Sequence, residues 1–299
     1  MIKNAIIYTV EMPTVADMEN YAAQFTVKKP GTHTRRTMGF TKHPVTSELV
    51  SPFEGGYCLS VLIWEKKIDA AALREALNEK VGQFEQVEGR PAKKTEKDTM
   101  RDEIVNELLP HVLPSPKYVY AYYHIESDTL LIDTANGETS DQVTALLRKA
   151  IGSLKATTVY IDNRIGLTEC LTQALQQCTS ALLEGDSMRI GERLELEGRE
   201  GEKVKYTDVN LLDDTTAEEV CAQIRDGGMS VKSIELTDFH IEWQLTDGFK
   251  FKSIKFPTWE GDPDSDNKAD EWYAETFYAM SKLVSVSTRI ADAFTVVEK

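Results

Sequence analysis

Residues 69–116 read DAAALREALNEKVGQFEQVEGRPAKKTEKDTMRDEIVNELLPHVLPSP, and the fold of the chain is best understood outward from this stretch. Over 69–86 the apolar side chains recur every three or four residues, which predicts an amphipathic helix. The residues at this spacing are Leu73, Leu77, Val81 and Phe84. The segment 87–92, which contains a glycine and a proline, interrupts the pattern.

A second helix is predicted from about Glu96 to Leu109. Thr95 is its expected N-cap, because Asp98, three residues later, completes a capping-box pattern. The apolar face of this helix is supplied by Met100, Ile104, Val105 and Leu108. The prolines that end it are Pro110, Pro114 and Pro116. The two helices therefore form a helical hairpin inserted between strands.

Strands are predicted on both sides of this hairpin, over 2–10, 57–65, 117–126, 129–135 and 155–161. The polar, basic stretch around 28–44 is expected to hold loops with short strands. A helix over 141–151 ends at Gly152, the residue type usual at that position. The first half thus predicts an α+β fold, with mixed or antiparallel sheets, packed helices and a projecting helical hairpin.

The second half is predicted to hold three helices, over 167–183, 215–226 and 269–296. The middle one begins at a threonine cap and is followed by Gly227-Gly228. A charged region at 184–202 is expected to contain short strands, because part of it alternates between apolar and polar residues.

A β-hairpin is predicted over 232–256. We expect a three-residue turn at 246–248, because Leu245 then faces Phe249 and the apolar faces of the two strands agree. A two-residue Asp-Gly turn would instead place Leu245 opposite Lys250. The preferred three-residue turn also places Lys252 opposite Glu242.

Charge is the main objection to a nucleic-acid partner. The 299 residues carry a formal net charge of −15, although 41% hydrophobic and 28% charged residues are ordinary for a globular chain of two or three modules. Phosphates repel an acidic surface. Binding to DNA would therefore require the basic residues to gather on one surface while the acids face elsewhere.

Membrane and secretory sequences are not evident. The chain has no apolar run of about 18 residues, and its first residues resemble a strand and lack the pattern of a signal peptide. The four cysteines form no CxxC pair and are expected to be free thiols, mostly buried, as in a reducing compartment. The cysteines are Cys58, Cys170, Cys178 and Cys221. These features favour a cytoplasmic protein.

Metal and catalytic motifs are also missing from the sequence. The five histidines lack metal-ligand spacing, and neither nucleotide-binding nor hydrolase fingerprints occur. The loop 262–267 resembles a calcium loop but has Asn267 and Tyr273 where the sixth-position glycine and twelfth-position glutamate are required. Asp133 and Asp162 end predicted strands and are the candidate metal ligands of an enzyme alternative, a metal-dependent nuclease.

Four basic residues, Lys93, Lys94, Lys97 and Arg101, gather where the second hairpin helix begins. Cations there oppose the helix dipole, so stability alone does not favour them. A helix start flanked by lysines is, however, suited to bind anions. On a helical wheel Lys97 and Arg101 lie together, away from the helix's glutamates. These four residues are candidate phosphate contacts; the alternative is an ordinary solvated surface.

Two further basic pairs have competing interpretations. Arg148 and Lys149 lie in the last turn of helix 141–151, where cations complement the helix dipole, although phosphate contact is compatible with that position. Lys250 and Lys252 alternate with phenylalanines, as in nucleic-acid platforms, but a cross-strand ion pair with Glu242 is the simpler interpretation.

Two blocks of sequence resemble the RdgC family of recombination-associated nucleoid proteins. The first runs from Lys93-Lys94-Thr95-Glu96-Lys97-Asp98 through Arg101-Asp102-Glu103 to Leu108-Leu109-Pro110, and the second is Leu146-Leu147-Arg148-Lys149-Ala150-Ile151-Gly152-Ser153-Leu154. Together the blocks are fairly specific. The similarity is strong from about 65 to 160 and loose elsewhere.

The resemblance implies a function. RdgC proteins form ring-shaped dimers around duplex DNA, bind it with little sequence preference, act in recombination and replication, and can restrain the recombinase RecA. It also implies a central region at 1–68 and 117–165, a finger at 69–116 and a base at 166–299. The expected partners are double-stranded DNA and a second copy, with no cofactor, and the expected location is the nucleoid.

This sequence departs from the family in two places. An aromatic near the finger tip is replaced by Leu113, so that Leu113, Pro114 and Pro116 are the expected dimer contact at that end. Near 206–209 the sequence lacks the family's adjacent basic residues. Two alternatives to DNA binding stay open: a metal-dependent DNA exonuclease, and an acidic protein-interaction module that acts on recombination proteins.

Overall fold

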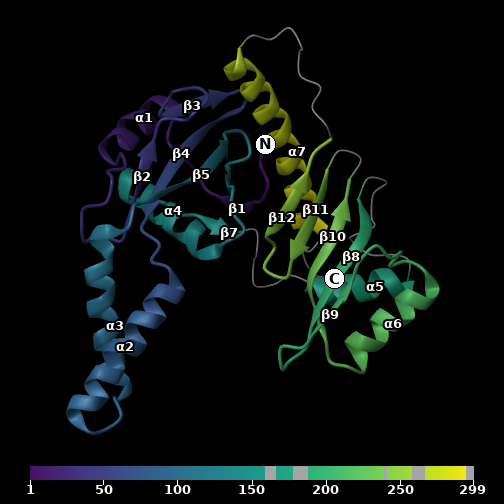
Figure 1. Cartoon of the computed structure of the whole chain (residues 1–299). Helices are drawn as coiled ribbons and strands as arrows, with labels where there is room; N and C mark the ends of the chain where they lie inside the picture. Colours follow the sequence, from purple (N-terminus) through teal and green to yellow (C-terminus); the bar gives the residue numbers. More distant parts are fainter. Residues whose placement is uncertain (159–165, 178–187, 239–240, 258–266, 294–299) are drawn as a thin grey trace.

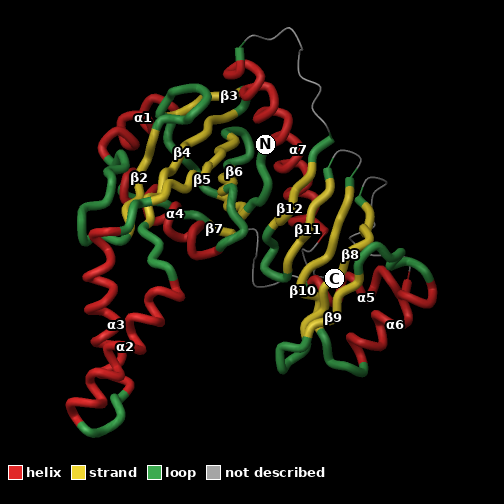
Figure 2. Tube along the Cα trace, in the orientation of Figure 1, coloured by secondary structure: helices red, strands yellow, loops and turns green. Residues whose placement is uncertain are grey.

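The three-dimensional structure is a computed structural model that describes residues 1–158, 166–177, 188–238, 241–257 and 267–293. It contains two antiparallel sheets with helices packed against them, and a helical hairpin that projects from the first sheet (Figures 1 and 2). The predicted α+β class with antiparallel sheets is confirmed. None of the described helices is both long and apolar enough to cross a bilayer.

The first sheet has seven strands in the order β2-β4-β5-β6-β1-β7, with β3 paired to β4 beyond the end of β2. Its strands are β1 (Ile6–Thr9), β2 (Arg36–Thr41), β3 (Val50–Phe53), β4 (Gly56–Glu65), β5 (Ser115–His124), β6 (Thr129–Ile132) and β7 (Thr157–Thr158). The long central pair, β4 and β5, is the frame from which the helical hairpin leaves and to which it returns.

Two helices, α1 (Val15–Gln24) and α4 (Gly137–Ile151), pack on one face of this sheet. The Asn136 side chain caps α4 by accepting the Thr139 N–H at 2.9 Å, so the helix starts four residues before the prediction. Gly152, with φ of 88°, ends it as predicted. Helix α1 has no counterpart in the sequence-based assignment.

The second sheet has five strands in the order β12-β11-β10-β8-β9. They are β8 (Arg189–Glu197), β9 (Lys203–Tyr206), β10 (Ser230–Thr237), β11 (Glu242–Thr246) and β12 (Phe251–Lys255). The helices of this half are α5 (Leu167–Gln177), α6 (Asp214–Arg225) and α7 (Lys268–Ala293). Their apolar residues and the inner faces of the strands share one core.

The two sheets are joined by the start of the chain. Ala5 and Phe251 exchange two backbone hydrogen bonds of 2.8 and 2.9 Å, and the Ile254 N–H donates to the Lys3 carbonyl at 2.9 Å. Residues of β1, β5 and β6 therefore belong to the same apolar cluster as the core of the second sheet.

Helix α7 strengthens this junction. The Trp272 ring lies 4.3 Å from the His43 ring, which in turn lies 5.3 Å from the Tyr120 ring. His43 is 4% exposed, and its Nδ1 accepts the Val45 and Thr46 N–H groups at 3.3 Å each. A neutral imidazole is thus part of the contact between α7 and the first sheet.

The helical hairpin consists of α2 (Ala70–Glu88), α3 (Lys94–Leu108) and a short 3-10 helix, η1 (Leu109–His111). It extends away from both sheets (Figure 1). With 19 residues, α2 is about 28 Å long. Among its described neighbours only α3 and the loops at its ends are close, so no residue of α2 is fully buried.

The start of α3 differs from the prediction. The helix begins at Lys94, and Thr95 lies inside its first turn instead of serving as the N-cap. The Glu96 carboxylate accepts the Lys93 N–H at 2.7 Å. Glu96 therefore occupies the capping-box position that was predicted for Asp98. Helix α6 also begins earlier than predicted, at Asp214 after Asp213, so its threonines do not cap it.

The turn between β11 and β12 is longer than predicted. Leu245 is opposite Phe251, two residues beyond the predicted partner Phe249, which lies in the turn with φ of 53°. A shift of two residues keeps the side chains next to the turn on their predicted faces, so Phe249 and Phe251 are both buried as expected. An irregularity between Glu242 and Gln244 places Lys255, and not Lys252, opposite Glu242.

The cysteine prediction is confirmed where the structure describes it. Cys58 and Cys170 are buried free thiols, and Cys221 is a half-buried free thiol. Burial raises the pKa of the Cys170 thiol to about 11. Cys178 lies outside the described residues, as do the ends of the predicted helix 167–183 and strand 155–161. The division into central, finger and base regions stays a prediction.

Candidate nucleic-acid interface

The predicted phosphate contacts of the hairpin lie at its far end. Lys93, Lys94, Lys97 and Arg101 are all exposed, on the first two turns of α3 and the residue before it. The turn that joins α2 to α3 is the part of the hairpin most distant from the sheets (Figure 1). We call these four residues the tip cluster.

The three glutamates of α3 are paired with cations outside the tip cluster. Arg90 donates to both Glu96 oxygens, at 3.0 and 2.7 Å. The Arg90 guanidinium and then the Lys93 N–H lower the pKa of Glu96 to about 2. Glu103 and Glu107 both face Lys80 on α2, at 2.7 and 3.8 Å.

The tip cluster is consequently uncompensated. Among the described residues, none of its four cations has a carboxylate within 4 Å. The glutamates of α3 lie toward α2 or Arg90, as the helical wheel predicts. This leaves the N–H groups at the helix start and four exposed positive charges in one place, the arrangement that attracts phosphate.

The remaining predicted cations lie elsewhere on the molecule. Arg148 and Lys149 are exposed at the end of α4, where the Lys149 ammonium lies 5.5 Å from the Phe25 ring. Lys250 is half-buried in the β11–β12 turn, and its ammonium lies close to Gly137 at the start of α4. Lys252 is opposite Gln244 on the outward face of the second sheet. The structure brings none of these four to the tip cluster.

Charge is segregated between the two halves of the chain. Residues 1–165 contain 20 lysines and arginines against 22 aspartates and glutamates, whereas 166–299 contain 14 against 27. Most described cations of the second half are also in ion pairs. Examples are Lys203 with Glu195, Lys232 with Asp247, Lys255 with Glu242 and Arg289 with Asp238. The net charge of −15 thus comes almost entirely from the second half, and the objection to DNA binding does not apply to the first.

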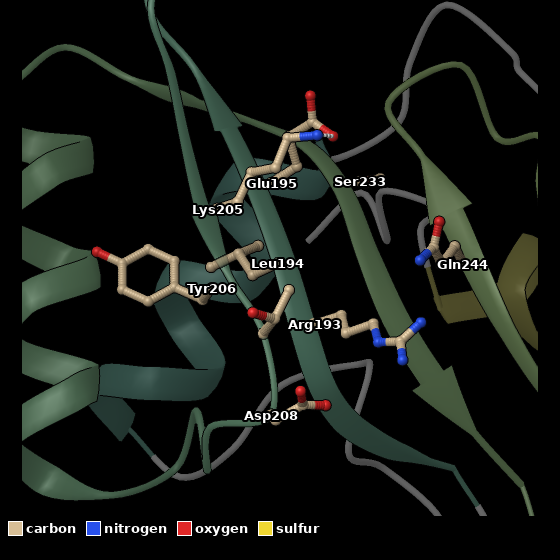
Figure 3. Close-up of a pocket in the computed structure, with 9 residues that line it drawn as sticks. Arg193, Leu194, Glu195, Lys205, Tyr206, Asp208, Ser233 and Gln244 are labelled. Atoms are coloured by element: carbon tan, nitrogen blue, oxygen red, sulfur yellow. Dashed lines mark ion pairs between the residues drawn. The ribbon is translucent and has the colours of Figure 1, made fainter.

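A hollow of about 400 Å³ on the second sheet illustrates the difference (Figure 3). It is lined by residues of both signs, and Lys205 approaches Glu195 to 3.4 Å. This is the region where the sequence lacks adjacent basic residues. Glu195 already compensates the positive charge of Lys205, so this face is poorly suited to bind a phosphate.

Leu113, Pro114 and Pro116 are not at the tip of the hairpin. They lie at its other end, where the chain returns to the first sheet: Leu113 and Pro114 are between η1 and β5, and Pro116 is the second residue of β5. The expected placement near the tip is therefore wrong, because the Leu-Leu-Pro motif ends the second helix and not the first. Leu113 is nonetheless 88% exposed, on a segment stiffened by prolines on both sides.

The nuclease candidate Asp133 has a structural role. Its carboxylate accepts the Lys3 and Asn4 N–H groups at 3.3 and 3.0 Å and so holds the first residues against β6. Burial raises the pKa of Asp133 above its ordinary value. In the described part of the chain, no three acids, histidines or cysteines are grouped as metal ligands. Asp162 lies outside the described residues.

One basic residue was missed by the sequence analysis. Lys66 is 4% exposed, and its ammonium donates to the carbonyls of Gly31, Thr32 and Leu109, at 3.1, 2.6 and 3.0 Å. No signal in the sequence separates it from its exposed neighbour Lys67, since lysines are rarely buried.

A family model described as "Putative exonuclease, RdgC" matches residues 1–296. The chain belongs to the RdgC family. The RdgC resemblance inferred from the two sequence blocks is thereby confirmed.

Relatives named "Recombination-associated protein RdgC" agree with this assignment. The one from Shewanella denitrificans is 30% identical over 263 residues, which cover 85% of this chain and 83% of that protein. The one from Shewanella frigidimarina is 32% identical over 179 residues, 58% of each chain. A third, from Psychromonas ingrahamii, is 34% identical over 111 residues, 36% of this chain and 37% of the relative.

Proposed function

We propose that this RdgC protein binds double-stranded DNA without sequence preference, through phosphate contacts made by the hairpin. The uncompensated tip cluster carries the proposal, because exposed lysines and an arginine without acid partners attract phosphates, and phosphate contacts carry no sequence information. Arg148, Lys149, Lys250 and Lys252 are proposed as secondary contacts, since they too form no ion pair among the described residues.

The protein acts, in this proposal, as a homodimer that closes a ring around the duplex. The acidic second half then lies on surfaces that repel DNA, while basic residues of the hairpin meet phosphates from more than one side. A protein that occupies duplex DNA in this way restrains RecA by denying it substrate, which agrees with the recombination-associated name of the relatives. Its place would be the nucleoid.

A salt titration of the full-length protein tests the proposal. If both tip clusters of a dimer engage, about eight phosphates are neutralised and log K falls with log salt concentration at a slope of about −7. The measurement is fluorescence anisotropy on several unrelated linear duplexes between 50 and 200 mM salt. No binding to any duplex at 50 mM salt would refute the proposal and leave the acidic protein-interaction module.

The same samples address the ring and the nuclease. A closed ring must open to load on a circular duplex, so we expect slower association with a nicked circle than with a linear duplex of equal length. Incubation of end-labelled duplex with Mg²⁺ or Mn²⁺ is expected to leave it intact. Metal-dependent degradation would instead support the exonuclease that the family description names.

Leu113, with its flanking prolines, is proposed to contact the second copy. Replacing Leu113 with aspartate is expected to raise the dimer dissociation constant about 10- to 100-fold, because burying a leucine contributes about 1.5 to 3 kcal/mol. Analytical ultracentrifugation measures this. Ile125→Asp is the matched control, since Ile125 is 54% exposed in the β5–β6 turn. Equal dissociation constants for the two variants would remove Leu113 from the interface.

A further inference from the structure

A second group of basic residues surrounds the place where the hairpin joins the first sheet. There β2 begins, β4 ends and β5 begins, since Arg36, Glu65 and Ser115 are successive partners across the three strands. The loop 28–35 lies against the same end. The Thr37 hydroxyl donates to the Lys28 carbonyl at 2.6 Å, and the Lys66 N–H donates to the Arg35 carbonyl at 2.9 Å.

The buried ammonium of Lys66 holds this region together. Two of its three acceptors, Gly31 and Thr32, belong to the loop, and the third, Leu109, belongs to the end of the hairpin. Because the donor is charged, these three hydrogen bonds are stronger than hydrogen bonds between neutral groups. Loop and hairpin are therefore fixed relative to each other.

The cations gathered here form what we call the root surface. Its members are Lys28, Lys29, Arg35, Arg36, Lys67 and Lys117. All but the half-buried Arg36 are exposed. The Lys29 ammonium lies 5.4 Å from the Trp64 ring centre, which orients it without neutralising it.

Acids near the root surface do not compensate it. Within the described ranges none of the six cations has a carboxylate within 4 Å, in contrast to the paired lysines of the second sheet. Of the neighbouring acids, Asp69 accepts the Ala71 and Ala72 N–H groups as the cap of α2. Glu65 is in none of the ion pairs that the structure describes.

We propose that the root surface is a second phosphate-binding site for the nucleic-acid backbone, assembled by Lys66 as a positioning residue. The inference rests on the proposed DNA binding and deepens it. Two uncompensated clusters lie at opposite ends of a helix about 28 Å long. A repeating polyanion suits such a pair, because a duplex presents a phosphate charge about every 1.7 Å along its axis and can meet both clusters at once.

Three full-length variants with the same charge change test the inference. The root variant is K28E/K29E/R35E, the tip variant is K93E/K94E/K97E, and the control is K42E/K155E/K268E, whose three lysines are exposed and remote from the hairpin. We expect the root variant to bind duplex at least tenfold more weakly than the control and its salt slope to fall by up to about 3 per protomer. Thermal unfolding verifies that all three are folded.

The outcomes separate the inference from the proposed function. If the unmodified protein binds no duplex, the proposed function fails. If it binds duplex and the root variant matches the control in affinity and slope, the root surface is not a DNA site and the inference is overturned. Binding of polyglutamate by the unmodified protein as tightly as duplex, lost in the root variant, would assign the surface to an acidic protein and also overturn it.

Lys66→Met tests the positioning role. The Lys66 ammonium is too buried to touch a phosphate, yet its removal is expected to lower duplex affinity several-fold and to speed amide exchange in 28–35. Faster exchange with unchanged affinity and salt slope would show that Lys66 stabilises the loop without serving DNA binding.

Discussion

Duplex affinity is expected to fall on the order of 100-fold when Lys93, Lys94 and Lys97 are all replaced by glutamate. Each lysine that no longer meets a phosphate releases fewer counterions, and each glutamate adds repulsion. The salt slope is expected to fall by about 3 per protomer, and the loss should be the same on unrelated duplexes because phosphates are contacted and not bases. Fluorescence anisotropy at several salt concentrations measures both effects.

The three substitutions are expected to weaken DNA binding without disturbing the fold of α3. The three side chains are exposed and form no ion pair among the described residues, so the fold of α3 does not depend on their charge. Acids in the first turn of a helix are favourable in themselves. A variant carrying K42E/K155E/K268E has the same net charge and controls for the general increase in negative charge. If the tip variant binds as this control does, the tip cluster is not a phosphate site.

The second large expected effect is a loss of folding stability at acidic pH. Unfolding free energy is expected to fall by up to about 3 kcal/mol between pH 6.5 and pH 4 because of His43 alone. Burial lowers the pKa of His43 from 6.5 to about 4. The unfolded chain therefore takes up a proton below pH 6.5, whereas the folded chain takes it up only near pH 4. The stabilisation is complete above pH 6.5 and is lost as the pH falls toward 4.

The contacts of His43 indicate that the packing of α7 against the first sheet is the part that loosens first as the pH falls. Its Nδ1 is occupied by two backbone N–H groups, and its ring packs against Trp272 of α7. Urea unfolding at pH 7, 6, 5 and 4.5, followed by tryptophan fluorescence, measures the loss. His43→Gln is expected to flatten the dependence on pH, while His33→Gln, on the exposed loop, leaves it unchanged. An unchanged pH dependence in His43→Gln would contradict the assignment.

The helical hairpin and the central strands were predictable because their patterns are local. Apolar spacing located α2 and α3, and the apolar residues of 57–65 identified β4 as a strand. Alternation also assigned the inward faces of β11 and β12. The exact register was not predictable from these patterns, because a shift of two residues leaves every face unchanged.

Features that depend on tertiary contacts were missed or misplaced. Lys66 looks like any surface lysine, and only the meeting of three chain segments shows that its ammonium is buried. The charge asymmetry between the two halves was also missed, although it can be counted from the sequence, because only the overall charge of −15 was considered. Leu113 was placed at the wrong end of the hairpin, although it follows the second helix and the order of the elements alone puts it at the base. The tip cluster, by contrast, lies within one helix start and was found directly.

The backbone pairing of Ala5 with Phe251 makes the order of synthesis matter. At about 5 to 20 residues per second, the ribosome delivers Phe251 roughly 12 to 50 s after Ala5. During that interval the first residues have no partner strand in the second sheet, although β1 can already pair once β6 is made. The hairpin and first sheet are thus available to fold early. The seam between the halves closes last, and with it the exposed edge of β12 disappears.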